Sequence, residues 1–164
     1  MSIIRKHGCA LPGYTGVGEE DKASEEVQAQ EAQEIVMQST NAEPIYQDAA
    51  FVYHILKTNS FINADFATAM LATENKDVVL IAEYGNLIIT DTKQALIESQ
   101  SYNVSPKLQP AKEEWEASLV DYNAAGGYLV QFAHDGQISS INLFNVKCTS
   151  GTDHLNKTTA IIST

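Results

Sequence analysis

The predicted fold depends most on residues 78–90, which read VVLIAEYGNLIIT. β-Branched and other apolar residues that favour strands dominate both halves of this stretch. Between the halves, Gly85-Asn86 is a two-residue connection suited to a type I′ or II′ turn. We therefore expect residues 78–84 and 87–90 to pair as a β-hairpin.

A second stretch, residues 128–146, has the same organisation. An apolar run over 128–133 is followed by His134-Asp135-Gly136, where Asp-Gly supplies the backbone geometry of a tight turn, and the chain returns over 138–146. Residues 158–163 fit one more strand. A second hairpin and a C-terminal strand are therefore predicted.

Helices are predicted around the first hairpin. Asp48 can cap a helix that places Phe51, Val52, Ile55 and Leu56 at helical spacing, although a strand over 51–56 is an alternative. A second helix is expected from residue 64, bringing Phe66 and Met70 onto one face, with Asn63 as its cap and residues 75–77 ending it. A third is expected to run from Asp91 or Thr92 as far as residue 97.

Another helix is predicted from Pro110 to about Tyr122, because proline is favoured in the first turn of a helix. It places Trp115, Leu119 and Tyr122 on one face, which indicates a stripe that packs in the core. Gly126-Gly127 is expected to end this helix.

The order of these elements predicts an α+β fold, with an antiparallel or mixed sheet built from the two hairpins and helices packed on one face. An extended N-terminal arm and an acidic helix precede the sheet. We divide the chain into residues 1–45, the arm with its acidic helical segment, and residues 46–164, a single α+β domain.

The N-terminal region is predicted to bind protein partners. Its first part is punctuated by glycines, and an extended arm of about 20 residues can reach roughly 65 Å. Residues 24–37 follow with good helix propensity but only a thin apolar stripe, so this helix needs a partner surface. The predicted partner-binding residues are the apolar Val27, Ile35 and Val36 and the acidic Glu25, Glu26, Glu31 and Glu34.

The net charge of the chain limits the kinds of partner that it is expected to bind. A formal net charge of −11 repels nucleic-acid phosphates and anionic lipid surfaces, so neither nucleic acid nor a membrane is an expected partner. No apolar run is long enough to span a bilayer, and the first residues turn polar before a signal peptide can develop. The chain is expected in the cytoplasm at synthesis and, after assembly, in a virion.

Catalytic and metal chemistry find little support in the residue pattern. The two cysteines lie far apart, and neither a zinc motif nor a catalytic-serine motif is present. Cys148, Asp153 and His154 are the minimum constellation for an activated thiol, but a cysteine at a strand end is more often a buried apolar residue. No catalytic residue, metal site, cofactor or small-molecule substrate is predicted, and His54 is expected at the surface or at a helix edge.

Three functions are weighed. The first is a non-enzymatic structural or interaction subunit of a larger assembly, in its most concrete form a phage-like virion protein whose N-terminal arm docks on neighbouring subunits. The alternatives are an acidic inhibitor or immunity-type protein that binds a basic partner, and a small enzyme with a site near Cys148.

Overall fold

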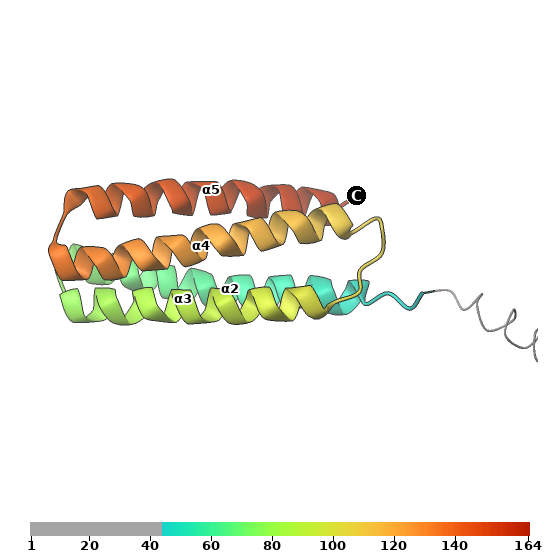
Figure 1. The fold of residues 1–164 in the computed structure, drawn as a ribbon, viewed down its shortest axis with the longest axis horizontal. Coiled ribbons are helices and arrows are strands. Elements are labelled where there is room, and N and C mark those ends of the chain that lie inside the picture. The colour runs from blue at the N-terminus through green and yellow to red at the C-terminus, as the bar shows by residue number, and fades with distance from the viewer. Residues whose placement is uncertain (1–43) are drawn as a thin grey trace, which may run out of the picture. The chain divides into compact units, whose positions relative to one another are not determined.

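Four long helices make up the part of the chain that the computed structural model describes, residues 44–164. They are α2 (Asp48–Glu74), α3 (Val78–Ser101), α4 (Gln109–Asp135) and α5 (Ile138–Ile162). The helices lie alongside one another and alternate in direction (Figure 1). Because α2 packs on α3, α3 on α4 and α4 on α5, the architecture is an up-and-down four-helix bundle.

The predicted α+β fold is therefore wrong, since residues 44–164 contain no strand. Residues 78–90 lie entirely within α3. The buried positions of α3 recur at alternating intervals of four and three residues, from Ile81 through Gly85, Ile88 and Thr92 to Ala95. This is the repeat of a packed helix, and three of its five positions hold glycine, threonine or alanine, so the apolar helical pattern is weak in the sequence.

Gly85 serves close helix packing and not a turn. A Cβ atom at this position would lie 2.8 Å from Val130 Cγ2 and 3.0 Å from the carbonyl oxygen of Gly126 on α4. The reciprocal contact is equally tight, because a Cβ at Gly126 would lie 2.8 Å from the Gly85 carbonyl oxygen. The two glycines let α3 and α4 approach backbone to backbone.

The second predicted hairpin is also wrong, although its turn is correctly placed. Residues 128–133 belong to α4 and residues 138–146 to α5, so the turn joins two helices. Gly136 ends α4 in the left-handed conformation, with φ of 64°. The predicted C-terminal strand is the last part of α5, and Gly126-Gly127 lies inside α4 instead of ending it.

The predicted helix boundaries are partly correct. The chain after Asp48 is helical, not a strand, but α2 continues through Asn63 as one helix. Residues 75–77 do separate two helices, and the Asp77 carboxylate caps α3 by accepting hydrogen bonds from the backbone N–H groups of Val79 and Leu80. Pro110 lies in the first turn of α4, as predicted.

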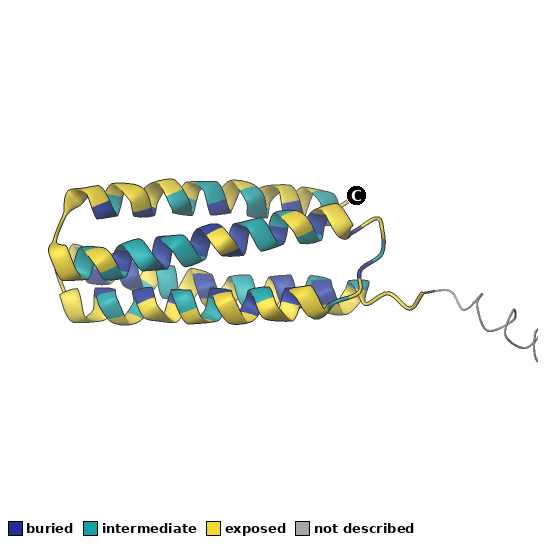
Figure 2. Ribbon diagram, viewed as in Figure 1, coloured by how far each residue is buried: buried dark blue, intermediate teal, exposed yellow. Residues whose placement is uncertain are grey.

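Buried residues lie on the sides of the helices that face one another (Figure 2). Their side chains form two clusters in the interior of the bundle. The first surrounds Trp115, which is fully buried with Leu119 and Tyr122, so the predicted core stripe of this helix is confirmed. The second surrounds Ile88, Leu129 and Phe144. None of the helices in residues 44–164 is long and apolar enough to cross a membrane.

Candidate functional site

His54 is the most unusual polar residue of the bundle. It lies on α2 with only 5% of its surface exposed, so the prediction of a surface position is wrong. Its Nδ1 atom is 3.4 Å from Glu98 Oε2 on α3, and its ring packs against those of Tyr102 and Trp115 at centroid distances of 5.4 and 6.2 Å. Neither His54 Nε2 nor Trp115 Nε1 makes a hydrogen bond within the described part of the chain.

Burial lowers the pKa of His54 below its usual 6.5, and the Glu98 carboxylate offsets only part of this effect. The imidazole is therefore neutral at pH 7. A second proton would have to enter at the buried Nε2, where no acceptor from residues 44–164 is present. His54 is thus placed to make the stability of the bundle depend on pH.

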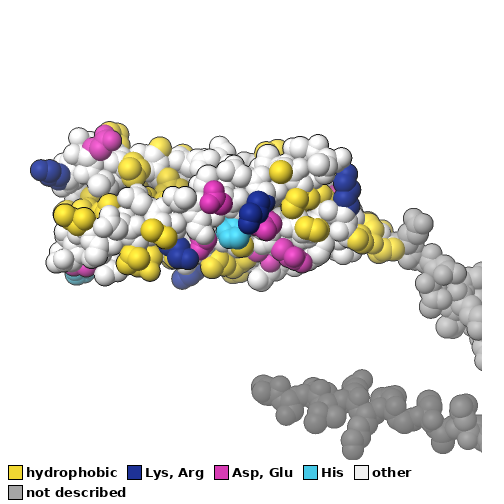
Figure 3. All heavy atoms as spheres, turned by 90° about the horizontal axis from the view of Figure 1, so that it is seen from above, with side chains coloured by type: hydrophobic (Ala, Val, Ile, Leu, Met, Phe, Trp, Pro, Cys, Tyr) yellow, Lys and Arg dark blue, Asp and Glu magenta, His cyan; other side chains and the backbone are white. Residues whose placement is uncertain are grey.

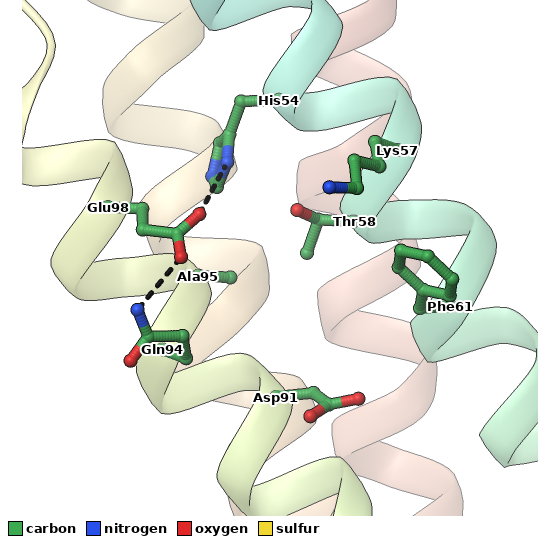
Figure 4. Close-up of a pocket in the computed structure, with 8 residues that line it drawn as sticks. All are labelled: His54, Lys57, Thr58, Phe61, Asp91, Gln94, Ala95 and Glu98. Atoms are coloured by element: carbon green, nitrogen blue, oxygen red, sulfur yellow. Dashed lines mark hydrogen bonds and ion pairs between the residues drawn. The ribbon is translucent and has the colours of Figure 1, made fainter.

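A shallow cavity lies beside His54, between α2 and α3 (Figure 4). Its volume is about 190 Å³, whereas pockets for drug-sized ligands have roughly 300–1,000 Å³. The close-up shows Glu98 held between His54 and Gln94, whose Nε2 donates a hydrogen bond of 2.8 Å to Glu98. The cavity is lined by His54, Lys57, Thr58, Phe61, Asp91, Gln94, Ala95 and Glu98.

Asp65 on α2 and Asp91 on α3 bring two carboxyl groups together near this cavity. Burial, followed by the neighbouring Asp91 carboxylate, raises the pKa of Asp65. Since its folded-state pKa is raised, ionised Asp65 costs stability at neutral pH, and this cost disappears as the pH falls. Its contribution therefore opposes that of His54 on acidification.

We expect the thermal stability of the bundle to fall as the pH drops below 6.5, because of His54. The pKa of His54 is lower in the folded state than in the unfolded state, so the unfolded state binds the proton more tightly. Acidification therefore favours unfolding. His54→Leu is expected to flatten Tm over this pH range, as followed by circular dichroism at 222 nm. His134→Gln, at an exposed position of α4, is the matched control and is expected to keep the slope. An unchanged slope in His54→Leu would refute this assignment.

A row of ion pairs joins α4 to α5. Lys147 Nζ lies 2.6 Å from Asp121 Oδ1, and His154 Nδ1 lies 2.6 Å from Glu114 Oε2. Lys157 Nζ reaches the same Glu114 oxygen at 3.5 Å. Seen from above, the face of the bundle on the α5 side gathers acidic, basic and histidine side chains midway along its length (Figure 3).

The pKa values of both α4 carboxyls are lowered in this row. The hydrogen bond from His154 is the main cause of the lowered pKa of Glu114. At Asp121 burial is the largest single effect and raises the pKa, but the hydrogen bonds from Lys147 and Ser150 and the nearby charges together outweigh it. Each of the three α5 side chains is thus held by a carboxylate across the helix pair. These contacts fix the register of α4 against α5.

The Cys148, Asp153 and His154 constellation does not form a catalytic site. All three residues lie on α5, where steps of 100° per residue direct them to different sides of the helix. Burial raises the pKa of the Cys148 thiol to about 12, so it is a poor nucleophile, and His154 is engaged by Glu114. Residues 44–164 also contain no group of three His, Cys, Asp or Glu side chains arranged to hold a metal ion.

A stripe of large apolar side chains on the outside of α2 was not predicted. Tyr53 and Leu56 are each 67% exposed, and Met70 and Leu71 are also exposed. We call these four residues the outer α2 face. The predicted grouping of Leu56 with Phe51 and of Met70 with Phe66, on the apolar faces of two shorter helices, is wrong because Leu56 and Met70 are exposed. Dividing the segment into two helices concealed an alignment that extends over the whole of α2.

The predicted partner-binding residues of the N-terminal region, from Glu25 to Val36, lie outside the described residues. Comparison of the chain with protein-family models, with curated proteins and with solved structures finds no match.

Proposed function

We propose that this chain is a non-enzymatic interaction subunit that assembles with other proteins through the outer α2 face. The observation that carries the proposal is the alignment of four large apolar side chains opposite the core. Single exposed apolar residues are common and need no explanation, but a row of them on one helix is typical of a contact surface.

The alignment follows from the helix geometry. Tyr53 and Leu71 are separated by about five full turns and therefore point in the same direction. Ile62, which is fully buried, lies midway between them and half a turn out of phase, so it points to the opposite side. The outer α2 face is thus directed away from the interior that α2 shares with the other helices.

The outer α2 face is also free of carboxylates. Between Tyr53 and Leu71 the one acidic residue of α2 is Asp65, which is half-buried beside Asp91 on α3. In a chain with a net charge of −11, such an uncharged stripe favours contact with protein over contact with water or polyanions. The small volumes of the two cavities described between helices, about 190 and 230 Å³, add no support for an enzyme that binds an organic substrate.

The size of the native chain in extracts of the cells that encode it tests this proposal. We expect it to elute in a defined complex larger than its own mass of 17.9 kDa. Leu56→Glu is expected to release the monomer, whereas Ile97→Glu, at a position of α3 that is 63% exposed, is the matched control and should leave the complex intact. Elution of the unmodified chain as a monomer would contradict the proposal. In its narrowest form, a phage-like virion subunit, the proposal also predicts copurification with intact particles.

A further inference from the structure

We infer that the outer α2 face binds the same face of a second copy of this chain, in an antiparallel pair of α2 helices. This inference rests on the proposed function and specifies its partner. It follows from the distribution of large and small side chains, from their charge, and from the length of the helix.

The side chains of the outer α2 face are distributed almost symmetrically about the middle of the helix. Tyr53 and Leu71 are equally distant from Ile62, and Leu56 and Met70 are equally distant from Asn63. A two-fold axis near residue 63 therefore places Leu56 of one copy beside Met70 of the other, and Tyr53 beside Leu71. Such self-complementarity is the requirement for an isologous dimer.

The middle of the stripe permits close approach. Nearest the proposed two-fold axis, the exposed residues on this side of α2 are the small or short Ser60, Asn63, Ala64 and Ala67, and the exposed Lys57 and Phe61 flank them on the side of the cavity between α2 and α3. Large residues at both ends and small residues at the centre let two helices pack near the 8–10 Å axial distance of ordinary helix pairs. Two copies of this surface fit each other without a bulky side chain at the crossing point.

Electrostatics also favours a second copy at this face. Two chains with a net charge of −11 repel each other wherever their carboxylates meet. Between Tyr53 and Leu71 the outer α2 face avoids this repulsion, because the one carboxylate of that stretch, Asp65, faces Asp91 on α3. By contrast, α4 carries the exposed Glu113 and the partly exposed Glu116.

The length of α2 limits the area of the proposed interface and therefore the expected affinity of the dimer. A helix of 27 residues extends for about 40 Å. Stable interfaces bury roughly 800 Å² on each partner, and a single pair of such helices lies at the lower end of that range. We therefore expect a dimer with a dissociation constant on the order of micromolar, which is detectable when the oligomeric state is measured over a range of protein concentrations.

Sedimentation velocity of the purified full chain, from about 1 to about 200 µM, tests the inference. The unmodified chain is expected to shift from monomer to dimer, and Leu56→Glu and Met70→Lys are each expected to weaken the dimer by about tenfold or more. Ile97→Glu is expected to have no effect. Circular dichroism checks that each variant keeps its helix content.

The double variant L56E/M70K distinguishes the antiparallel pair from other dimers. In that pair the introduced carboxylate at position 56 lies opposite the introduced amine at position 70 of the other copy, so dimerisation is expected to return and to weaken with salt. A dimer that resists Leu56→Glu, or that L56E/M70K fails to restore, would overturn the inference. A monomer at all concentrations would overturn it as well, while a large complex of the same chain in cell extract would still support the proposed function.

Discussion

Replacement of Gly126 by alanine is expected to destabilise the bundle by about 1–3 kcal/mol, whereas the same change at Gly127, the next residue of α4, is expected to stabilise it by about 0.5–1 kcal/mol. Both glycines lie inside a helix, where alanine is intrinsically preferred. The two sites differ only in what a new methyl group meets.

At Gly126 the methyl group would lie 2.8 Å from the Gly85 carbonyl oxygen and 3.0 Å from Ile88 Cγ2, so α3 and α4 must move apart. At Gly127 it would meet no atom within 4 Å. Urea unfolding followed by circular dichroism measures both changes. Equal shifts of the unfolding midpoint in the two variants would show that the close approach of α3 and α4 is wrong.

Replacement of Trp115 by alanine is expected to have the largest effect of any single truncation, a loss of about 3–5 kcal/mol. The indole is fully buried in the first core cluster, which brings together side chains from α2, α3 and α4 and from the connection before α4. Its removal leaves a cavity that the surrounding helices cannot fill without moving. The loss is measured by thermal and urea unfolding at 222 nm.

Trp115→Phe is the graded control, since it keeps an aromatic ring and also removes the Nε1 donor that has no partner in the described residues. It is expected to lose much less stability than Trp115→Ala. A loss below about 1 kcal/mol in Trp115→Ala would mean that this residue does not lie at the centre of the core.

The sequence allowed correct prediction of some boundaries and of one helix face. Pro110 and the stripe of Trp115, Leu119 and Tyr122 were predicted correctly, because proline chemistry and large apolar residues at helical spacing are local signals. Gly136 was recognised as a turn residue for the same reason. Each of these predictions used only neighbouring residues.

The helical nature of residues 78–90 could not be recognised in this way. Its β-branched residues favour a strand, and Gly85 followed by asparagine resembles a hairpin turn. What decides the structure is the distant Gly126, against which Gly85 packs across the helix pair. A contact between residues 41 positions apart leaves no local signal, and tertiary packing overrides propensity here.

The candidate site could not be predicted from neighbouring residues either. His54 was expected at the surface because its flanking residues were read from one helix alone, whereas Tyr102, Glu98 and Trp115 from other parts of the chain bury it. The outer α2 face could not be predicted from two separate helices, because its residues align only along the single continuous helix α2. Its row of apolar residues is a pattern over the full length of that helix, from Tyr53 to Leu71.

A disulfide cross-link at the expected two-fold axis tests most directly whether two copies meet through α2. Asn63→Cys is introduced into the full chain with Cys9 replaced by serine, and Thr90→Cys, at an exposed position of α3, is the matched control. A symmetric antiparallel pair brings the two copies of position 63 within about 4–7 Å between Cα atoms, the range that a disulfide requires. Our account predicts a covalent dimer for Asn63→Cys under mild oxidation and none for Thr90→Cys. Equal cross-linking of the two variants, or none in either, would contradict it.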